Sequence, residues 1–336
     1  MSGNLLAHAF LGLLPVSCFL AALVYLDSYK LVSIRWVLGV IALGGATAGL
    51  SYLIHSNLLD ILNIQLTSYT RYVSPFIEEF LKATIIVMLI RHNRIGFLVD
   101  AAIFGFAVGA GFAMIENLYF LQILPDSHIA VWIVRGFGTA IMHGGATAIF
   151  AVASHALLGQ KSSLGPIVLL PGFFVAMITH SIFNHFFFTP VLNTIGVLIV
   201  LPMLLSVVFI QSEKSVVDWL DIGFDADTEL LQLINSGEFS TSKVGMYLHS
   251  LKEKFRGEVV ADLLCYLRVH VELSIRAKGL LMMRESGFEN KTGEETRAKL
   301  EEIKYLEGSI GATGKLAIKP FLQMSRKDLW QFYMLS

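Results

Sequence analysis

The chain has 336 residues, of which 55% are hydrophobic and only 15% are charged, and its formal net charge is −1. Ordinary soluble domains carry about 25% charged residues, so this composition argues against a protein that is soluble throughout. No basic run suggests nucleic-acid binding. Only 8 of the 25 Lys and Arg residues and 7 of the 26 Asp and Glu residues precede Gln211. We therefore expect a membrane domain followed by a soluble one.

Seven segments are apolar and long enough to span a membrane as helices, which takes about 20 residues each. They are 5–26, 36–55, 75–91, 97–121, 130–158, 165–188 and 191–211. A shorter amphipathic segment, 57–72, is expected to lie at the membrane interface. In 97–121 small residues recur at every fourth position, from Ala101 through Gly105 and Gly109 to Ala113, a pattern typical of closely packed helices. The predicted fold is an all-α polytopic bundle of about seven transmembrane helices over residues 1–211.

Residues 212–336 form a second predicted domain, which is all-α and soluble. Apolar residues recur at helical spacing in four segments, 227–235, 243–255, 257–285 and 294–307. The domain shows no metal-ligand spacing, phosphate loop or nucleophile elbow. We expect a cytoplasmic module that regulates the membrane domain or binds a partner.

Lys and Arg residues in short loops predict the orientation, because they are enriched on the cytoplasmic side. The loops after the first, third and fifth predicted helices hold Lys30, Arg35, Arg91, Arg94 and Lys161. The loops after the second, fourth and sixth hold only Arg71. This asymmetry places the N-terminus outside and the second domain in the cytoplasm.

The third predicted span contains two adjacent glutamates, Glu78 and Glu79, followed by Lys82. A charge near the middle of a membrane helix costs about 2.5–3.5 kcal/mol, so these residues need a structural or functional reason. Ser74 is expected to cap this helix and Pro75 to occupy its first turn. Lys82 lies within reach of both acids, so one glutamate can pair with it while the other points to a different face.

Three more predicted helices carry polar residues at the same depth. Glu116 lies one turn before the outer end of its helix, and His143 follows Arg135 on one stripe of the next helix. His180 and Asn184 are four residues apart and share a face. Four helices thus bring acids, imidazoles and an amide to overlapping depths, which predicts one buried polar site.

Simpler structural readings stand beside this prediction. Glu79 with Lys82 is typical of an ion pair, and Arg135 is expected to neutralise an acid or reach the membrane surface. His185 precedes three phenylalanines and is expected at the lipid interface. His143 alone reads equally well as a core histidine. His55, near the end of the second span, is given no role.

Peptide hydrolysis in a membrane needs a water, a base and donors for the oxyanion. In one route Glu and His residues bind a metal that activates the water, and a remaining glutamate is the base. In the other, Glu78 activates the water directly, His143 positions it, and His180 with Asn184 stabilises the oxyanion. No His-Glu-x-x-His run or Gly-x-Ser-x-Gly motif occurs, so a zincin helix and a serine nucleophile are disfavoured. The residues leave both routes open.

The ordered motifs resemble those of the PrsW family of membrane proteases, which is similar to the CAAX prenyl proteases and bacteriocin-immunity-type membrane proteins. The resemblance covers about residues 70–190. It rests on Pro75-Phe-Ile-Glu-Glu-Phe-Leu-Lys82, Glu116-Asn-x-Tyr119, His143-Gly144 and His180-x-x-x-Asn184. The spacing Glu-Glu-x-x-Lys follows PrsW rather than the Glu-Glu-x-x-x-Arg of CAAX proteases, which disfavours a prenylated substrate.

The resemblance implies an intramembrane endopeptidase of a bacterial inner membrane. It implies cleavage of a membrane-anchored protein near the outer face, as in site-1 cleavage of an anti-sigma factor. The catalytic residues it implies are Glu78, Glu79, Glu116, His143, His180 and Asn184. If a divalent metal such as zinc is bound, the expected ligands are Glu79, Glu116, His143 and His180.

Two functions from other classes compete with a protease. A non-catalytic membrane scaffold or chaperone could keep the same fold, because a fold does not guarantee activity. A proton-coupled transporter could use the same intramembrane acids and histidines. Transporters are commonly built from inverted repeats with broken helices, and the sequence shows neither.

Overall fold

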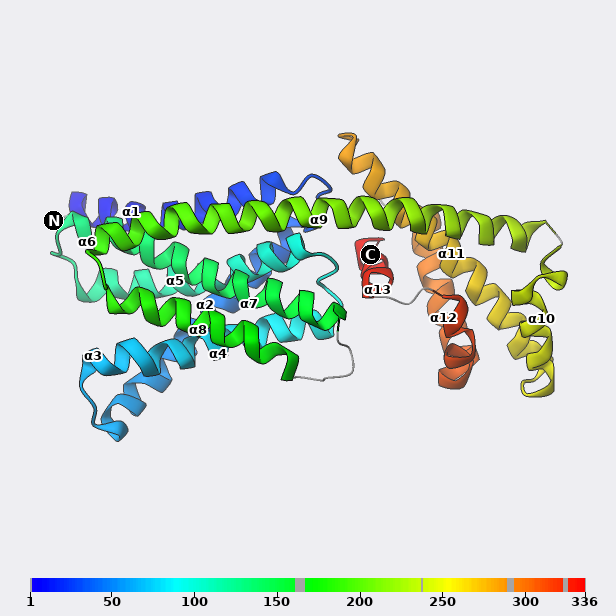
Figure 1. Cartoon of the computed structure of the whole chain (residues 1–336), viewed down its shortest axis with the longest axis horizontal. Helices are drawn as coiled ribbons and strands as arrows, with labels where there is room; N and C mark the ends of the chain where they lie inside the picture. Colours follow the sequence, from blue (N-terminus) through cyan, green and yellow to red (C-terminus); the bar gives the residue numbers. More distant parts are fainter. Residues whose placement is uncertain (1, 161–166, 237, 289–292, 323–325, 336) are drawn as a thin grey trace. The chain divides into compact units, whose positions relative to one another are not determined.

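The structure is a computed structural model that describes residues 2–160, 167–236, 238–288, 293–322 and 326–335. All regular structure in these residues is helical (Figure 1), which confirms the predicted all-α class. Lys161, which contributed to the orientation argument, lies outside the described residues, as do residues 165 and 166 of a predicted span. The chain forms two compact units, Met1–Asp27 with Val32–Ser212, and Ser28–Leu31 with Glu213–Ser336.

The first unit is a bundle of long helices connected by short ones. The long helices are α1 (Ser2–Leu26), α2 (Ile34–Leu62), α4 (Ser74–Arg91), α5 (Leu98–Ile123), α7 (Ile141–Gln160), α8 (Leu170–His185) and α9 (Pro190–Asn235). The short segments are α3 (Leu66–Ser68), α6 (Ile129–Ile133) and two π-helical stretches, η1 (Tyr69–Val73) and η2 (Val134–Ala140).

Among the described residues, six helical segments are long and apolar enough to cross a membrane, one fewer than the seven expected. The helix outside this set is α4, which has 18 residues and carries four charged side chains, Glu78, Glu79, Lys82 and Arg91. The first three of these are buried inside the bundle. Its length is therefore close to that of a membrane span, but its composition is not.

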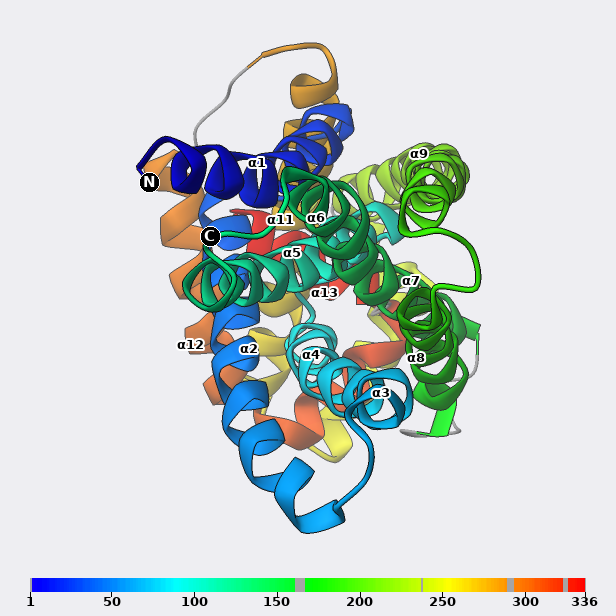
Figure 2. The same cartoon turned by 90° about the vertical axis from the view of Figure 1, so that its left-hand side faces the viewer.

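Helix α5 occupies the centre of the first unit. Nearly all of its residues between Val99 and Ala113 are buried, and it packs against α7, α2 and α1. Figure 2 looks along the bundle and shows these helices around α5. A Cβ atom at Gly109 would collide with the backbone carbonyl of His143, so glycine is needed for the close approach of α5 and α7. The stripe of small residues predicted this packing.

The directions of the helices determine which side chains share an end of the bundle. Gly44 of α2 lies at Val108 of α5, and the ring of Tyr52 lies against that of Tyr119, so these two helices run in the same direction. Helix α4 connects them and therefore runs back between the two ends. We call the end at which α1 begins the N-terminal end. The other end lies at Ser212, whose hydroxyl accepts a hydrogen bond from the N–H of Val99 at 3.0 Å.

The segment 57–72 is divided between several helical elements, and its position at the membrane interface stays a prediction. Helix α2 continues to Leu62, the chain turns at Asn63 with φ 49°, and α3 and η1 then lead without a break into α4. Ser74 consequently lies inside a helix and is not its cap, so that prediction was wrong. Pro75 removes a backbone donor and crowds the preceding turn. The wider π turn before it accommodates this disturbance without ending the helix.

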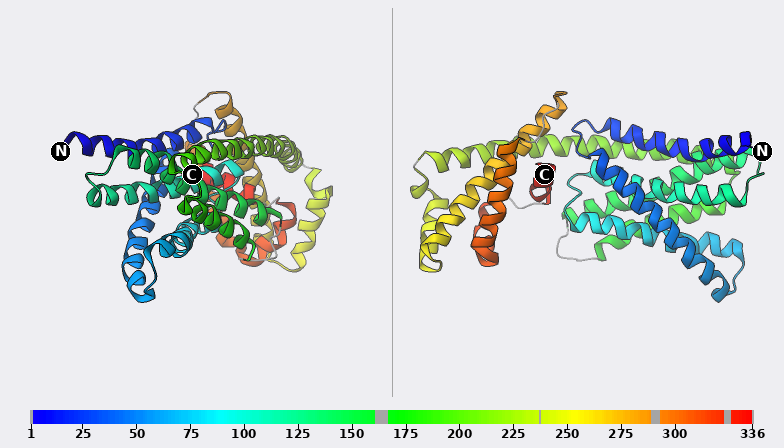
Figure 3. Two further views of the ribbon diagram at one scale, coloured as in Figure 1. Left: turned by 60° about the vertical axis from the view of Figure 1, so that its left-hand side comes forward. Right: turned by 180° about the vertical axis from the view of Figure 1, so that it is seen from behind.

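The second unit is also helical, and Figure 3 shows its helices from two further sides. After α9 come α10 (Lys243–Ser250), α11 (Gly257–Glu285), α12 (Glu294–Ile318) and α13 (Arg326–Leu335). The predicted span 191–211 is part of a longer helix, because α9 continues past residue 211 as a single helix of 46 residues. The change from apolar to charged residues there alters the helix surface but supplies no helix-breaking residue.

An apolar core and one buried ion pair hold the second unit together. Leu263, Leu267 and Ala277 of α11 are fully buried in this core. Lys278 on the same helix bonds Asp227 of α9, with Nζ 2.6 Å from Oδ2. These contacts fix α11 against the end of α9 within this unit.

Candidate functional site

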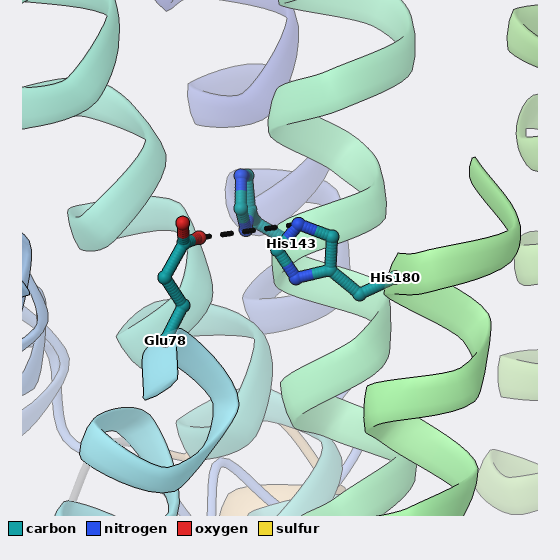
Figure 4. Close-up of side chains that lie close together, drawn as sticks. All are labelled: Glu78, His143 and His180. Carbon is teal, nitrogen blue, oxygen red and sulfur yellow. Dashed lines mark ion pairs between the residues drawn. The ribbon is translucent and has the colours of Figure 1, made fainter. Parts of the chain in front are cut away.

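Three side chains from three helices converge near the N-terminal end of the bundle. Glu78 of α4, His143 of α7 and His180 of α8 each offer an oxygen or nitrogen atom, and these atoms lie within 4.8 Å of one another. All three residues are buried, with exposed fractions of 7%, 1% and 2%. Figure 4 shows them pointing toward one another, with the closest Glu78–His180 ion pair at 3.9 Å. We call this set the Glu–His–His group.

Glu79 lies beside this group and is already bound on two sides. Its Oε1 is 2.5 Å from Nζ of Lys82, which confirms the predicted ion pair. The same oxygen is 2.7 Å from Nδ1 of His180. Adjacent residues on a helix point about 100° apart, so Glu78 and Glu79 serve different neighbours.

The contact with Glu79 determines how His180 presents its ring. An ionised carboxylate can only accept, so Nδ1 of His180 carries the proton and donates it to Glu79. The lone pair on Nε2 then faces Oε2 of Glu78. A carboxylate that orients a histidine through its other nitrogen is the usual arrangement behind a metal-binding imidazole.

His143 is held from three directions. Its Nδ1 lies 3.0 Å from Nζ of Lys82, and its Nε2 lies 3.3 Å from Oε2 of Glu116. The ring meets that of His180 edge to face with centroids 4.7 Å apart, and it lies beside Phe112. These contacts place a third acidic residue, Glu116, at the edge of the Glu–His–His group.

Glu116 is the most accessible of the polar residues here, with 26% of its side chain exposed. Its Oε2 is 3.3 Å from Arg135, which in turn donates to Asn117 at 2.8 Å. The neutralising role expected for Arg135 is thereby confirmed. A carboxylate that is both charge-balanced and partly open to solvent is suited to exchange protons with a water.

The structure does not bring Asn184 into the group, although it lies one turn after His180. Its amide donates to the backbone carbonyl of Thr70 at 2.9 Å and so ties α8 to η1. His185 stacks on Phe187 and meets the ring of Tyr72. The oxyanion role of Asn184 stays a prediction, and its observed contact is structural.

Sequence reasoning missed His55. Its Nε2 lies 3.3 Å from Oε1 of Glu78, and its Nδ1 lies 2.6 Å from the hydroxyl of Tyr69. We had ended the second helix at residue 55, whereas α2 continues for two further turns and carries His55 alongside α4. The spacing of Ser51 and His55, four residues apart on one helix face, was the available signal.

The residues of the Glu–His–His group suit a metal ion. One carboxylate oxygen and two imidazole nitrogens match the three protein ligands of many catalytic zinc sites, which keep a fourth position open. Oε2 of Glu78 is buried and makes no hydrogen bond to the described residues, so a ligand-binding atom is available. Glu78 belongs to this group, whereas Glu79 lies beside it and is bound to Lys82 and His180. The role of Glu79 as a metal ligand stays a prediction. The predicted ligands His143 and His180 both belong to the group.

Comparison with known families gives one finding. A sequence model described as the PrsW family of intramembrane metalloproteases matches residues 32–210, more than half of the chain. Comparison with curated proteins and with solved structures gives no significant match. The matched region contains the whole Glu–His–His group together with Glu79, Lys82, Glu116 and Arg135.

Proposed function

Because the chain belongs to the PrsW family of intramembrane metalloproteases, we propose that it cuts a membrane-anchored protein at the Glu–His–His group. One observation supports this assignment above all others. Glu78, His143 and His180 come from three separate helices and place ligand atoms within 4.8 Å of one another inside the matched region. Burying ionisable residues inside a membrane protein costs free energy, so a functional role explains these three residues better than a structural role alone.

Glu78, His143 and His180 would hold the metal, and zinc suits their mixture of oxygen and nitrogen donors. When bound, such an ion lowers the pKa of a water and polarises the carbonyl of the peptide. Glu79 holds His180 in the orientation that leaves Nε2 available, and Lys82 balances the charge of Glu79. Family membership favours this route over the metal-free one.

Glu116 is the acid that remains to accept the proton of the attacking water. Its Oε2 lies 3.3 Å from Nε2 of His143, at the edge of the group and partly open. Arg135 balances its charge in the resting state. The same carboxyl group, once protonated, can give its proton to the leaving amine, because peptide hydrolysis requires protonation of that nitrogen.

The orientation of the bundle supports a substrate that is cut near the outer face. With α4 as a seventh crossing, the N-terminus and the end at Ser212 lie on opposite sides of the membrane. The excess of Lys and Arg at the Ser212 end supports a cytoplasmic location for that end. The Glu–His–His group is then in the outer half, where a single-span protein such as an anti-sigma factor presents its outer stalk. The second unit is then cytoplasmic.

Fragment proteomics of bacterial membranes tests the proposal. Membranes containing the wild type, Glu78→Gln or His180→Ala are compared for new protein N-termini, with Asp60→Asn as a matched control on an exposed acid of α2. We expect one membrane-protein fragment with the wild type and the control, and none with the two site variants. Equal fragments from all four proteins at equal abundance would contradict a protease built on this group.

A further inference from the structure

A chain of hydrogen bonds reaches Glu78 from the side opposite the two histidines. The hydroxyl of Tyr69 lies 2.6 Å from Nδ1 of His55, and Nε2 of His55 lies 3.3 Å from Oε1 of Glu78. Ser51 adds a contact at 2.8 Å to the same Nε2. Tyr69 is 3% exposed, so its hydroxyl has little access to water. These residues belong to α2 and η1, outside the motifs that carry the family resemblance.

The chemistry of the three groups gives the chain a direction. An ionised carboxylate can only accept, so the contact with Glu78 favours a proton on Nε2 of His55, and the hydroxyl of Ser51 can accept from the same N–H. With the phenol as donor, Nδ1 accepts and the single ring proton lies on Nε2, directed at Glu78. In this arrangement the phenol of Tyr69 donates to His55, and His55 donates to Glu78.

The two oxygens of Glu78 consequently differ. Oε1 is bound by His55 and also by the hydroxyl of Ser74, which lies one turn earlier on the same helix. Oε2 has no hydrogen-bond partner among the described residues and faces His180. A carboxylate anchored through one oxygen cannot rotate freely, so its other oxygen is held toward the histidines.

We propose that His55, oriented by Tyr69, is a positioning residue that fixes the carboxylate of Glu78 and presents Oε2 to the Glu–His–His group. This inference rests on the proposed function, in which Oε2 binds the metal. Partners that orient metal ligands typically change metal affinity or activity by about 10- to 100-fold when they are removed. Because His55 contacts Glu78 and not the substrate, its loss lowers kcat and leaves KM nearly unchanged.

Two substitutions of His55 separate its two nitrogens. In His55→Gln the side-chain amide can occupy the position of Nε2 and still donate to Glu78. In His55→Asn the shorter amide takes the position of Nδ1, so the bond to Glu78 is lost while that to Tyr69 is kept. Tyr69→Phe removes the phenol that orients the ring. His92→Asn, on an exposed histidine at the other end of α4, is the matched control.

Zinc affinity is measured on the purified full-length proteins by competition with a chromogenic chelator. We expect a loss of about 10- to 100-fold for His55→Asn, a smaller loss for His55→Gln and Tyr69→Phe, and none for His92→Asn. Thermal unfolding in the same detergent identifies any variant that fails to fold. If His55→Asn fails to fold, the zinc affinities of His55→Gln and Tyr69→Phe are compared with that of the wild type instead. Wild-type zinc affinity and kcat in folded His55→Asn would overturn the inference.

Infrared spectroscopy tests the role of His55 independently of the proposed function. The carboxylate band of Glu78 is assigned as the band lost in Glu78→Gln, and hydrogen bonds to one oxygen shift its frequency. We expect His55→Asn to shift this band even in protein without zinc, and His92→Asn to leave it in place. If the wild type binds no zinc, the proposed function fails, while the band of Glu78 still decides whether His55 positions it. An unshifted band in His55→Asn would count against the inference.

Discussion

Each unit of the molecule buries a lysine against a carboxylate, and the two pairs are built in different ways. Lys82 and Glu79 lie three residues apart on α4, with Nζ 2.5 Å from Oε1. Lys278 and Asp227 come from α11 and α9 and meet at 2.6 Å. Both members of the first pair belong to one helix, so this pair connects no separate elements. The second pair connects two helices.

The neighbours of the two pairs differ even more. Lys82 also contacts Nδ1 of His143, and Glu79 also binds His180, so the first pair contacts both histidines of the Glu–His–His group. Asp227 accepts from the hydroxyl of Ser274, and Lys278 lies over the ring of Trp219. A buried charge is therefore no sufficient sign of an active site. The side chains to which the pair is connected decide its role.

Removing Lys278 should have the largest effect on stability. Lys278→Met leaves Asp227 without its cation, and breaking a buried pair costs about 3–5 kcal/mol. We expect about 3 kcal/mol, because Asp227 keeps some contact with water. Hydrogen exchange of α11 in the full-length protein measures the loss, while cleavage per folded molecule stays at the wild-type value. The double change Asp227→Leu/Lys278→Met should recover most of the stability, since apolar pairs replace buried ion pairs well.

Removing Lys82 should instead act on the chemistry. Lys82→Met frees Glu79 and removes a contact of His143, so we expect cleavage and metal affinity to fall by about 10- to 100-fold. The double change Glu79→Leu/Lys82→Met removes the uncompensated charge but also the acceptor of His180, so it should stay impaired. Recovery of cleavage in that double variant would show that the first pair is structural, like the second.

A substitution at Gly109 tests whether the stability of the first unit depends on the close approach of α5 and α7 as well as on its buried charges. Gly109→Ala forces α5 away from the carbonyl of His143 and should cost about 1–3 kcal/mol. Gly49→Ala is the matched control, because a Cβ at that position of α2 meets no atom within 4 Å. The control should keep or raise stability, since alanine favours a helix by about 1 kcal/mol over glycine. Chemical unfolding of both variants in detergent gives the difference.

The smallest effect concerns a partly buried ion pair of the second unit, Lys299 with Glu272. Burial raises the pKa of Glu272, but hydrogen bonds from Lys299 and Arg268 outweigh it and lower that pKa below its ordinary value. A lowered carboxyl pKa stabilises the fold above the unfolded value of about 4.3, and this contribution disappears as the pH falls through the folded value. Lys299→Met should therefore cost less than about 1 kcal/mol at pH 7, and the cost should become smaller as the pH falls to 3. Unfolding curves at the two pH values check the sign.

The sequence alone predicted the helical class and the convergence of Glu78, His143 and His180, because charges inside apolar segments are few and need partners. It did not separate the tasks of Glu78 and Glu79, because that depends on which face of α4 meets α8. It also missed His55, since apolar periodicity does not distinguish the end of a helix from its continuation. The uninterrupted α9 was missed for a related reason, because a change in polarity does not end a helix.

The two π-helical segments each precede a residue of the Glu–His–His group, η1 before Glu78 and η2 before His143. A π turn holds one residue more than an α turn, so each stretch shifts the residues after it by one position along the helix. Closing η1 into an ordinary α turn without removing a residue would rotate the residues after it by about 100°. Glu78 would then occupy the position of Glu79, and Lys82 would turn away from His143. The wide turn in 69–73 therefore determines which of the two adjacent glutamates faces the histidines.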